Sequence, residues 1–134
     1  MPRTVMNPES VHSAPGYSHI AVAEGEKLVF FAGQVSLDDD LNIVGEDDLR
    51  LQVITAMSNL AKVMEAAGAS WDDIVRRTVY TTQPFELAAI GESIAQVTGD
   101  AADPPQTIVG VTGLALPGLL VEIECTASLR SSTL

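Results

Sequence analysis

The stretch from Val121 to Ser128, VEIECTAS, constrains the fold most, because apolar and polar residues alternate along it without a break. Successive side chains of a β-strand point to opposite faces of a sheet, so one face of this strand is apolar and the other polar. The apolar face needs a cover of helices. The polar face is solvated unless another layer or another subunit covers it. The pattern therefore predicts a sheet with helices on one side.

The rest of the chain supplies further elements of such a sheet. Short β-branched or apolar runs predict strands, and the longer periodic runs predict helices. We expect the first two strands to form a hairpin with Gly25 in its turn. The order implies one α+β domain over residues 1–134, with a mixed sheet and two helices on one face. The expected strands are residues 20–23, 27–35 (a buried strand), 74–82, 106–111 and 119–128, and the expected helices are residues 46–67 and 84–97.

The two expected helices differ in the clarity of their patterns. In the first, apolar residues recur at helical spacing on one face, and Gly68 follows where a left-handed cap is expected. In the second, Pro84 is tolerated in the first turn. The side chains expected to face the core are Leu49, Val53, Met57, Leu60 and Met64 in the first helix and Phe85, Ala88 and Ile94 in the second.

The charge balance excludes several classes of partner. Seven basic and 18 acidic side chains give a formal net charge of −11. A surface this negative repels the phosphates of nucleic acids and of anionic membranes, so we expect neither partner. No apolar run approaches the roughly 20 residues of a membrane-spanning helix. The single cysteine and a start without the apolar core of a signal peptide favour a cytoplasmic protein.

Standard catalytic and metal-binding motifs are largely absent from the sequence. Two histidines and one cysteine are too few for a zinc cluster, and the acidic run at residues 38–40 lacks the ligand spacing of a calcium loop. No phosphate-binding glycine loop occurs, and we expect no metal and no cofactor. Cys125 belongs to the apolar set and is expected to be a small buried hydrophobe. The polar side chains left as candidates are Tyr17, Arg76, Arg77, Gln106, Glu122 and Glu124.

Four stretches together resemble one protein family. They are GYS at residues 16–18, FFAGQV at residues 30–35, NLAKVMEAAGASWDDIVRRTVY at residues 59–80 and LPGLLVEIECTA at residues 116–127. In this order, and over nearly the whole chain, they are similar to the motifs of the RidA (YjgF) family. The resemblance implies a chorismate-mutase-like fold of the bacillus type and a homotrimer with clefts between neighbouring subunits, which would cover the polar sheet face.

The resemblance also implies a set of site residues. The archetype hydrolyses 2-imino acids to 2-keto acids and ammonia, and its glutamate helps to position the attacking water. Glu122 matches that glutamate and is the expected catalytic residue. The archetype's arginine, which binds the substrate carboxylate, is replaced here by Gln106, so the chain is an atypical member. The expected substrate-binding residues are Tyr17, Gln106, Gly33, Ile108 and Ile94.

The change from arginine to Gln106 alters the expected ligand. A guanidinium is a charged donor with a fixed fork, whereas a carboxamide offers one neutral NH₂ group. We therefore expect a small-molecule ligand that is neutral or cationic. Two functions remain open. The protein hydrolyses an imine, enamine or related C–N bond in a substrate without an α-carboxylate, or it is a non-catalytic trimer that binds a metabolite or acts as a stress or chaperone-like protein.

Overall fold

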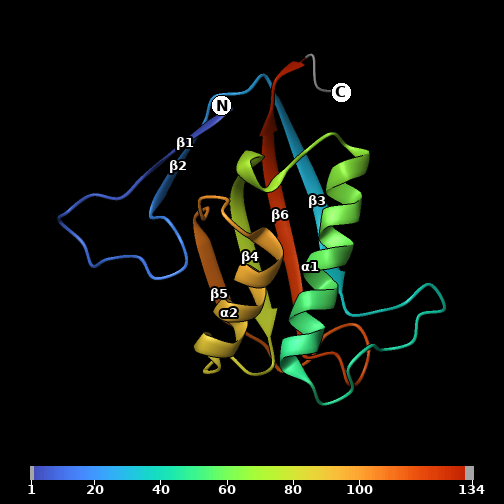
Figure 1. The fold of residues 1–134 in the computed structure, drawn as a ribbon. Coiled ribbons are helices and arrows are strands. Elements are labelled where there is room, and N and C mark those ends of the chain that lie inside the picture. Colours follow the sequence, from blue (N-terminus) through green and yellow to red (C-terminus); the bar gives the residue numbers. More distant parts are fainter. Residues whose placement is uncertain (1, 132–134) are drawn as a thin grey trace.

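The computed structural model describes residues 2–131 and builds them around one mixed sheet (Figure 1). Each α-helix lies between two strands in sequence, and a short 3-10 helix precedes the fourth strand. The strands are β1 (Arg3–Met6), β2 (Ile20–Ala23), β3 (Lys27–Val35), β4 (Ile74–Thr81), β5 (Gln106–Gly110) and β6 (Val121–Leu129), and the helices are α1 (Leu49–Ala66), η1 (Trp71–Asp73) and α2 (Leu87–Thr98).

The main sheet has the strand order β3-β6-β4-β5. The β3–β6 and β6–β4 pairs are antiparallel, and the β4–β5 pair is parallel. Both helices lie on the same face of this sheet (Figure 1). The residues of β6 that form the apolar set of the alternating pattern are all buried in the core beneath the helices. The predicted α+β architecture, with a mixed sheet and helices on one face, is therefore confirmed.

Helix α1 follows its predicted pattern closely. It begins at Leu49, where the side chain of Asp48 accepts a hydrogen bond from the Leu51 amide at 3.0 Å. It ends before Gly68, which has φ +76° and so takes the left-handed conformation expected of a helix cap. All five side chains expected to face the core are buried. Among the described residues, no helix is long and apolar enough to cross a membrane.

Helix α2 differs from its prediction at the first turn. It begins at Leu87, because residues 84 and 85 lie in the preceding turn. The expected inward positions of Phe85 and Ala88 are wrong: Phe85 is 94% exposed, and Ala88 is also exposed. The expected inward position of Ile94 is confirmed, and Ile90 is buried beside it, since a helix that starts at Leu87 turns these two positions toward α1 and the sheet.

The predicted hairpin of β2 with β3 is wrong. Strand β2 pairs antiparallel with β1, a strand that the sequence did not predict, and the two form a separate ribbon (Figure 1). The buried Arg3 fastens this ribbon to the main sheet by donating to the carbonyl oxygens of Ile74, at 2.5 Å, and Ala102, at 2.6 Å. Gly25 lies after β2 and lets the chain pass close to β6: a Cβ there would be 2.5 Å from the Leu129 carbonyl oxygen.

The sheet face opposite the helices is uncovered within the described residues, and we call it the open face. Strand β3, expected to be fully buried, is exposed there: Phe30 is 74% exposed, and Leu28 is also exposed. These residues pair with Thr126 and Ser128 of β6, which belong to the polar set of the alternating pattern. The open face thus combines apolar side chains with carboxylates and hydroxyls.

Candidate functional site

A cavity of about 830 Å³ opens beside the edge strand β5. Its walls come from the loop before β2, the outer side of α2 and β5 itself. Three of the predicted site residues, Tyr17, Gln106 and Ile108, lie on these walls. We call it the Tyr17–Gln106 cavity. Its full lining is His12, Pro15, Gly16, Tyr17, Leu87, Ala88, Gly91, Glu92, Ala95, Gln106, Thr107 and Ile108.

Ser18 holds the Tyr17 loop against the segment that precedes β5. Its amide donates to the carbonyl oxygen of Pro104 at 3.1 Å, and its hydroxyl donates to the carbonyl oxygen of Asp103 at 2.6 Å. These two bonds bring Tyr17 to the same cavity as Gln106. The Tyr17 hydroxyl is in turn hydrogen-bonded to Nε2 of His12, with 2.5 Å between the atoms. The loop thus places Tyr17 on the cavity wall with its hydroxyl bound to His12.

Gln106 is held by a buried cation. It is the first residue of β5 and lies opposite Arg77 of β4 in the parallel register. Nε of Arg77 donates to Oε1 of Gln106 at 2.5 Å, and Nη2 of Arg77 lies 3.8 Å from Oδ1 of Asp103. Arg77 is only 2% exposed. Burial lowers its pKa, which nearby Asp103 partly counters. The guanidinium stays charged at neutral pH, because an arginine side chain is not deprotonated in proteins.

Cys125 is a structural residue. It is buried on β6, directly opposite Arg77, and it is a free thiol. Burial raises its pKa to about 12, although the Arg77 charge acts in the other direction. A thiol with so high a pKa forms almost no thiolate at neutral pH, so it is not a nucleophile. The placement agrees with the small buried hydrophobe expected from the sequence.

The two glutamates of β6 have different surroundings on the open face. Glu124 accepts a hydrogen bond from the Tyr80 hydroxyl at 2.6 Å, and this bond raises the pKa of Tyr80. Glu122 makes no hydrogen bond or ion pair with any described residue. Its side chain lies against Gly33 of β3, where an added Cβ would overlap the carboxylate. Gly33 therefore leaves the space that the free carboxylate of Glu122 occupies.

One chain does not bring all the predicted site residues together. Arg77 and Gln106 point to the helix side of the sheet, whereas Glu122, directly opposite Tyr80, points to the open face. Gly33 and Glu122 thus form one group, and Tyr17, Gln106 and Ile108 form another. Ile94 belongs to neither group: it is 2% exposed and packs in the core, so its side chain does not line the cavity.

The cavity also contains residues that the sequence did not single out. His12 and Glu92 are its ionisable examples, and Glu92 is paired with Arg50 of α1 at 2.9 Å. His12 joins the site through the fold of its loop, which has no periodic pattern. A signal did exist on α2, where the apolar or small residues at positions 87, 88, 91 and 95 follow helical spacing. They form a second, outward apolar stripe.

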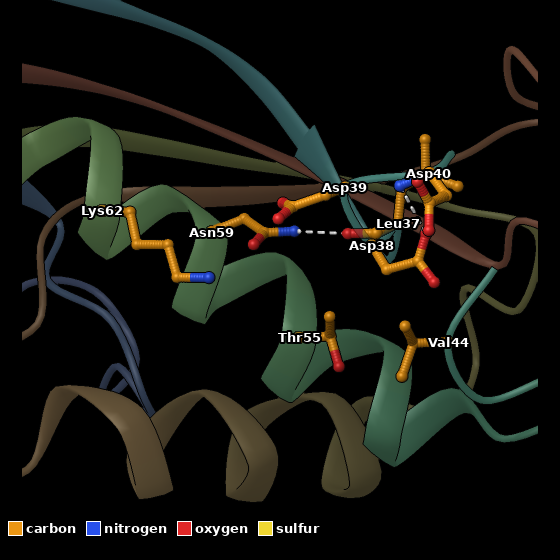
Figure 2. Close-up of a pocket in the computed structure, with 8 residues that line it drawn as sticks. All are labelled: Leu37, Asp38, Asp39, Asp40, Val44, Thr55, Asn59 and Lys62. Atoms are coloured by element: carbon orange, nitrogen blue, oxygen red, sulfur yellow. Dashed lines mark hydrogen bonds between the residues drawn. The ribbon is translucent and has the colours of Figure 1, made fainter. Parts of the chain in front are cut away.

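A second cavity, of about 410 Å³, lies beneath the acidic loop that follows β3 (Figure 2). Oδ1 of Asp38 accepts hydrogen bonds from the amides of Asp40 and Asn42, both at 2.9 Å. The Asn59 side chain donates to the Leu37 carbonyl oxygen at 3.2 Å. Within residues 2–131, no group of three or more His, Cys, Asp or Glu side chains is placed to hold a metal ion. These polar groups mainly shape the loop itself.

Comparisons with known proteins give a consistent result. The family model described as endoribonuclease L-PSP matches residues 8–129. The RutC family protein slr0709 of Synechocystis is 32% identical over 84% of this chain and 85% of its own length. Among solved structures, YyfB from Yersinia pestis, a Rid-family protein of unknown function, is 37% identical with a TM-score of 0.91, and the match covers 96% of this chain and 100% of that one.

A more distant structure has the same fold. Rv2704 of Mycobacterium tuberculosis, a member of the highly conserved YjgF/YER057c/UK114 family, is 32% identical with a TM-score of 0.65, over 95% of this chain and 99% of its own. The match of the family model, the sequence identities and the shared architecture all lead to the same group. The chain belongs to the endoribonuclease L-PSP family, the Rid (YjgF) proteins.

Proposed function

We propose that the protein is a homotrimer whose Tyr17–Gln106 cavity binds an uncharged small molecule. We further propose that it hydrolyses an imine, enamine or related C–N bond in a substrate without an α-carboxylate. The observation that carries this proposal is the neutral charge of the Gln106 side chain. The residue in the place of the family's carboxylate-binding arginine is a neutral amide, and the nearby cation, Arg77, is buried behind it and shared with Asp103.

The surface that one chain leaves uncovered supports the proposed trimer. The open face exposes Leu28 and Phe30, and large exposed apolar groups on a sheet favour contact with another subunit. Strand β5 lies at the edge of the sheet order, beside the cavity. Contact between the open face of one subunit and the β5 edge of the next would bring Glu122 to a neighbour's cavity. The two separate groups of site residues then form one cleft.

In that cleft each residue has a distinct role. Tyr17 and Gln106 hydrogen-bond the substrate, and Ile108 supplies an apolar wall. Glu122 of the neighbouring subunit orients a water molecule and accepts its proton as the water oxygen bonds to the imine carbon. The C=N double bond opens and the proton passes to the nitrogen, which gives a carbinolamine. The hydroxyl proton then also moves to the nitrogen, the C–N bond breaks as the C=O bond forms, and the products are a carbonyl compound and ammonia. Glu124 takes no direct part, because its carboxylate is bound to Tyr80.

One observation favours the non-catalytic alternative, a trimer that binds a metabolite or acts as a stress or chaperone-like protein. Within one chain the cavity holds no free carboxylate to serve as a base. Glu92 is paired with Arg50, and Glu122 is on the other side of the sheet. If subunits do not bring Glu122 to the cavity, the site binds without catalysis.

Ribonuclease activity, which the description of the matching family model names, is not favoured. RNA binding depends on basic side chains that neutralise phosphates. This chain has 18 acidic and seven basic residues. The cavity adds no arginine or lysine to its lining. An RNA backbone would therefore meet repulsion over most of the surface.

Two imines that differ in the carboxylate test the proposal. An amino-acid oxidase supplies 2-iminopropionate, and an amine oxidase supplies an aldimine without a carboxylate. With added protein, we expect ammonia release from the aldimine to accelerate and release from 2-iminopropionate to stay at the uncatalysed rate. The reason is that no charged donor faces the substrate in the cavity. Efficient hydrolysis of 2-iminopropionate would contradict the proposal. Binding of the corresponding aldehyde without acceleration of the aldimine's hydrolysis would favour the non-catalytic alternative.

A further inference from the structure

We propose that Arg77 is a positioning residue that fixes the Gln106 amide with its NH₂ group toward the cavity, so that the site selects a ligand with an uncharged carbonyl oxygen. This inference deepens the proposed function and rests on it for the cavity being a ligand site. It adds what the function alone does not define, namely which polar atom the ligand presents at Gln106.

The orientation of the amide follows from the chemistry of its partner. A guanidinium has only N–H donors, so the Gln106 atom at 2.5 Å from Nε of Arg77 is the carbonyl oxygen. The amide nitrogen therefore lies on the side away from Arg77. No residue among those described accepts a hydrogen bond from it, and Gln106 lines the cavity. Its two N–H groups are left for a ligand, and a ligand atom there must be an acceptor.

The surroundings of the Gln106 amide hold it in this orientation. Arg77 is buried, so its guanidinium cannot turn away to solvent, and it lies in a cross-strand pair with the half-buried Gln106. Rotating the amide would place its NH₂ group against Nε–H of Arg77, two donors facing each other in a buried site. Leaving a donor without an acceptor inside a protein is unfavourable, because the lost hydration of the donor is not replaced. One orientation is therefore strongly favoured.

The charges around the cavity favour a ligand with a neutral acceptor over one with a carboxylate. The positive charge of Arg77 is shared with Asp103, whose carboxylate lies 3.8 Å away. The one carboxylate that lines the cavity, Glu92, is paired with Arg50 at 2.9 Å. The wall is thus close to electrically neutral, and it offers an anion no unshared cation to offset the loss of its hydration. An amide, lactam or ketone oxygen fits these conditions.

Three small probes of similar size separate the possibilities by NMR. N-methylpyrrolidinone is an uncharged acceptor, pyruvate is an anionic acceptor and acetamidinium is a cationic donor. We expect N-methylpyrrolidinone to shift the side-chain NH₂ signals of Gln106 and to bind at least about tenfold more tightly than either other probe. The NH₂ signals of Gln34, which lies on β3 away from the cavity, serve as an internal reference. Tighter binding of pyruvate would overturn the inference.

A Gln106→Glu variant tests the amide itself. The new carboxylate still accepts from Arg77, so the variant is expected to fold, but it presents an acceptor to the cavity in place of NH₂. We expect the preference to invert, with acetamidinium binding at least about tenfold more tightly than N-methylpyrrolidinone. An unchanged preference would mean that Gln106 does not contact the ligand, and the inference would fail.

A pair of arginine variants tests the positioning role. Arg77→Met frees the Gln106 amide to turn, so it should lose most of the preference for N-methylpyrrolidinone over acetamidinium. The matched control is Arg76→Met, which removes the neighbouring arginine on the other face, where it binds Thr107. It should keep the preference. If Arg77→Met is too unstable to study, the Gln106→Glu result decides. The readout for all these probes is binding and not turnover, so failure of the imine assay leaves this test intact.

Discussion

The Glu122→Gln variant is expected to hydrolyse the aldimine at least about a hundredfold more slowly than the natural protein, because an amide cannot accept the proton of the attacking water. The matched variant is Glu124→Gln, two residues along the same strand face. It should stay within about threefold of the natural rate, because the Glu124 carboxylate is bound to Tyr80. A threefold change in rate corresponds to a change of less than about 1 kcal/mol in the activation free energy. Steady-state rates with the same oxidase-coupled supply of imine provide the comparison.

The structural reason for the difference is the partner of each carboxylate. Glu124 already accepts a hydrogen bond from Tyr80, whereas Glu122 is free and lies against Gly33. A Tyr80→Phe variant serves as a control, because it removes the bond to Glu124 without touching Glu122. Equal losses for both glutamate variants would mean that the polar face of β6 acts as a whole and that Glu122 has no special role.

The Gln106→Arg variant is expected to be about 1–3 kcal/mol less stable than the natural protein, although it restores the residue of the family's archetype. The introduced guanidinium would face that of Arg77 in a buried site, and Nε of Arg77 would lose its acceptor. Chemical denaturation measures the loss. A variant as stable as the natural protein would show that Arg77 does not depend on Gln106.

Exchanging the two residues should reverse this effect. In a variant carrying both Arg77→Gln and Gln106→Arg, the two side chains again form one donor–acceptor pair across β4 and β5. We expect most of the lost stability to return. The guanidinium now belongs to the strand that lines the cavity, so we also expect hydrolysis of 2-iminopropionate to appear in the double variant. Activity in Gln106→Arg alone, without the exchange, would contradict this account.

The sequence predicts the main sheet and helix α1 well, for a physical reason. The alternation from Val121 to Ser128 and the periodic run from Leu49 to Met64 both record burial on one face, and burial dominates the stability of such elements. Strand β1 has only four residues and was not predicted. The predicted partner of β2 was wrong because β1 had not been predicted. Without that competing strand, the turn at Gly25 indicated a hairpin of β2 with β3.

The site was harder to predict than the fold. That Gln106 and Glu122 lie on opposite sides of the sheet depends on the register of β5 against β4, which no local pattern reveals. The pairing of Arg77 with Gln106 depends on the same register. His12 reaches the cavity only through the path of its loop. Resemblance to a family suggested the candidate positions, whereas the contacts around them came from the structure.

Sedimentation equilibrium of the natural protein at micromolar concentration tests the central claim most directly, because a cleft that joins Glu122 to the Tyr17–Gln106 cavity requires neighbouring subunits. We predict a single species of three times the 14.1 kDa of the chain. A Phe30→Glu variant, which places a charge on the exposed apolar part of the open face, should shift the protein toward the monomer. A stable monomer of the natural protein would contradict the cleft and the role of Glu122 in it.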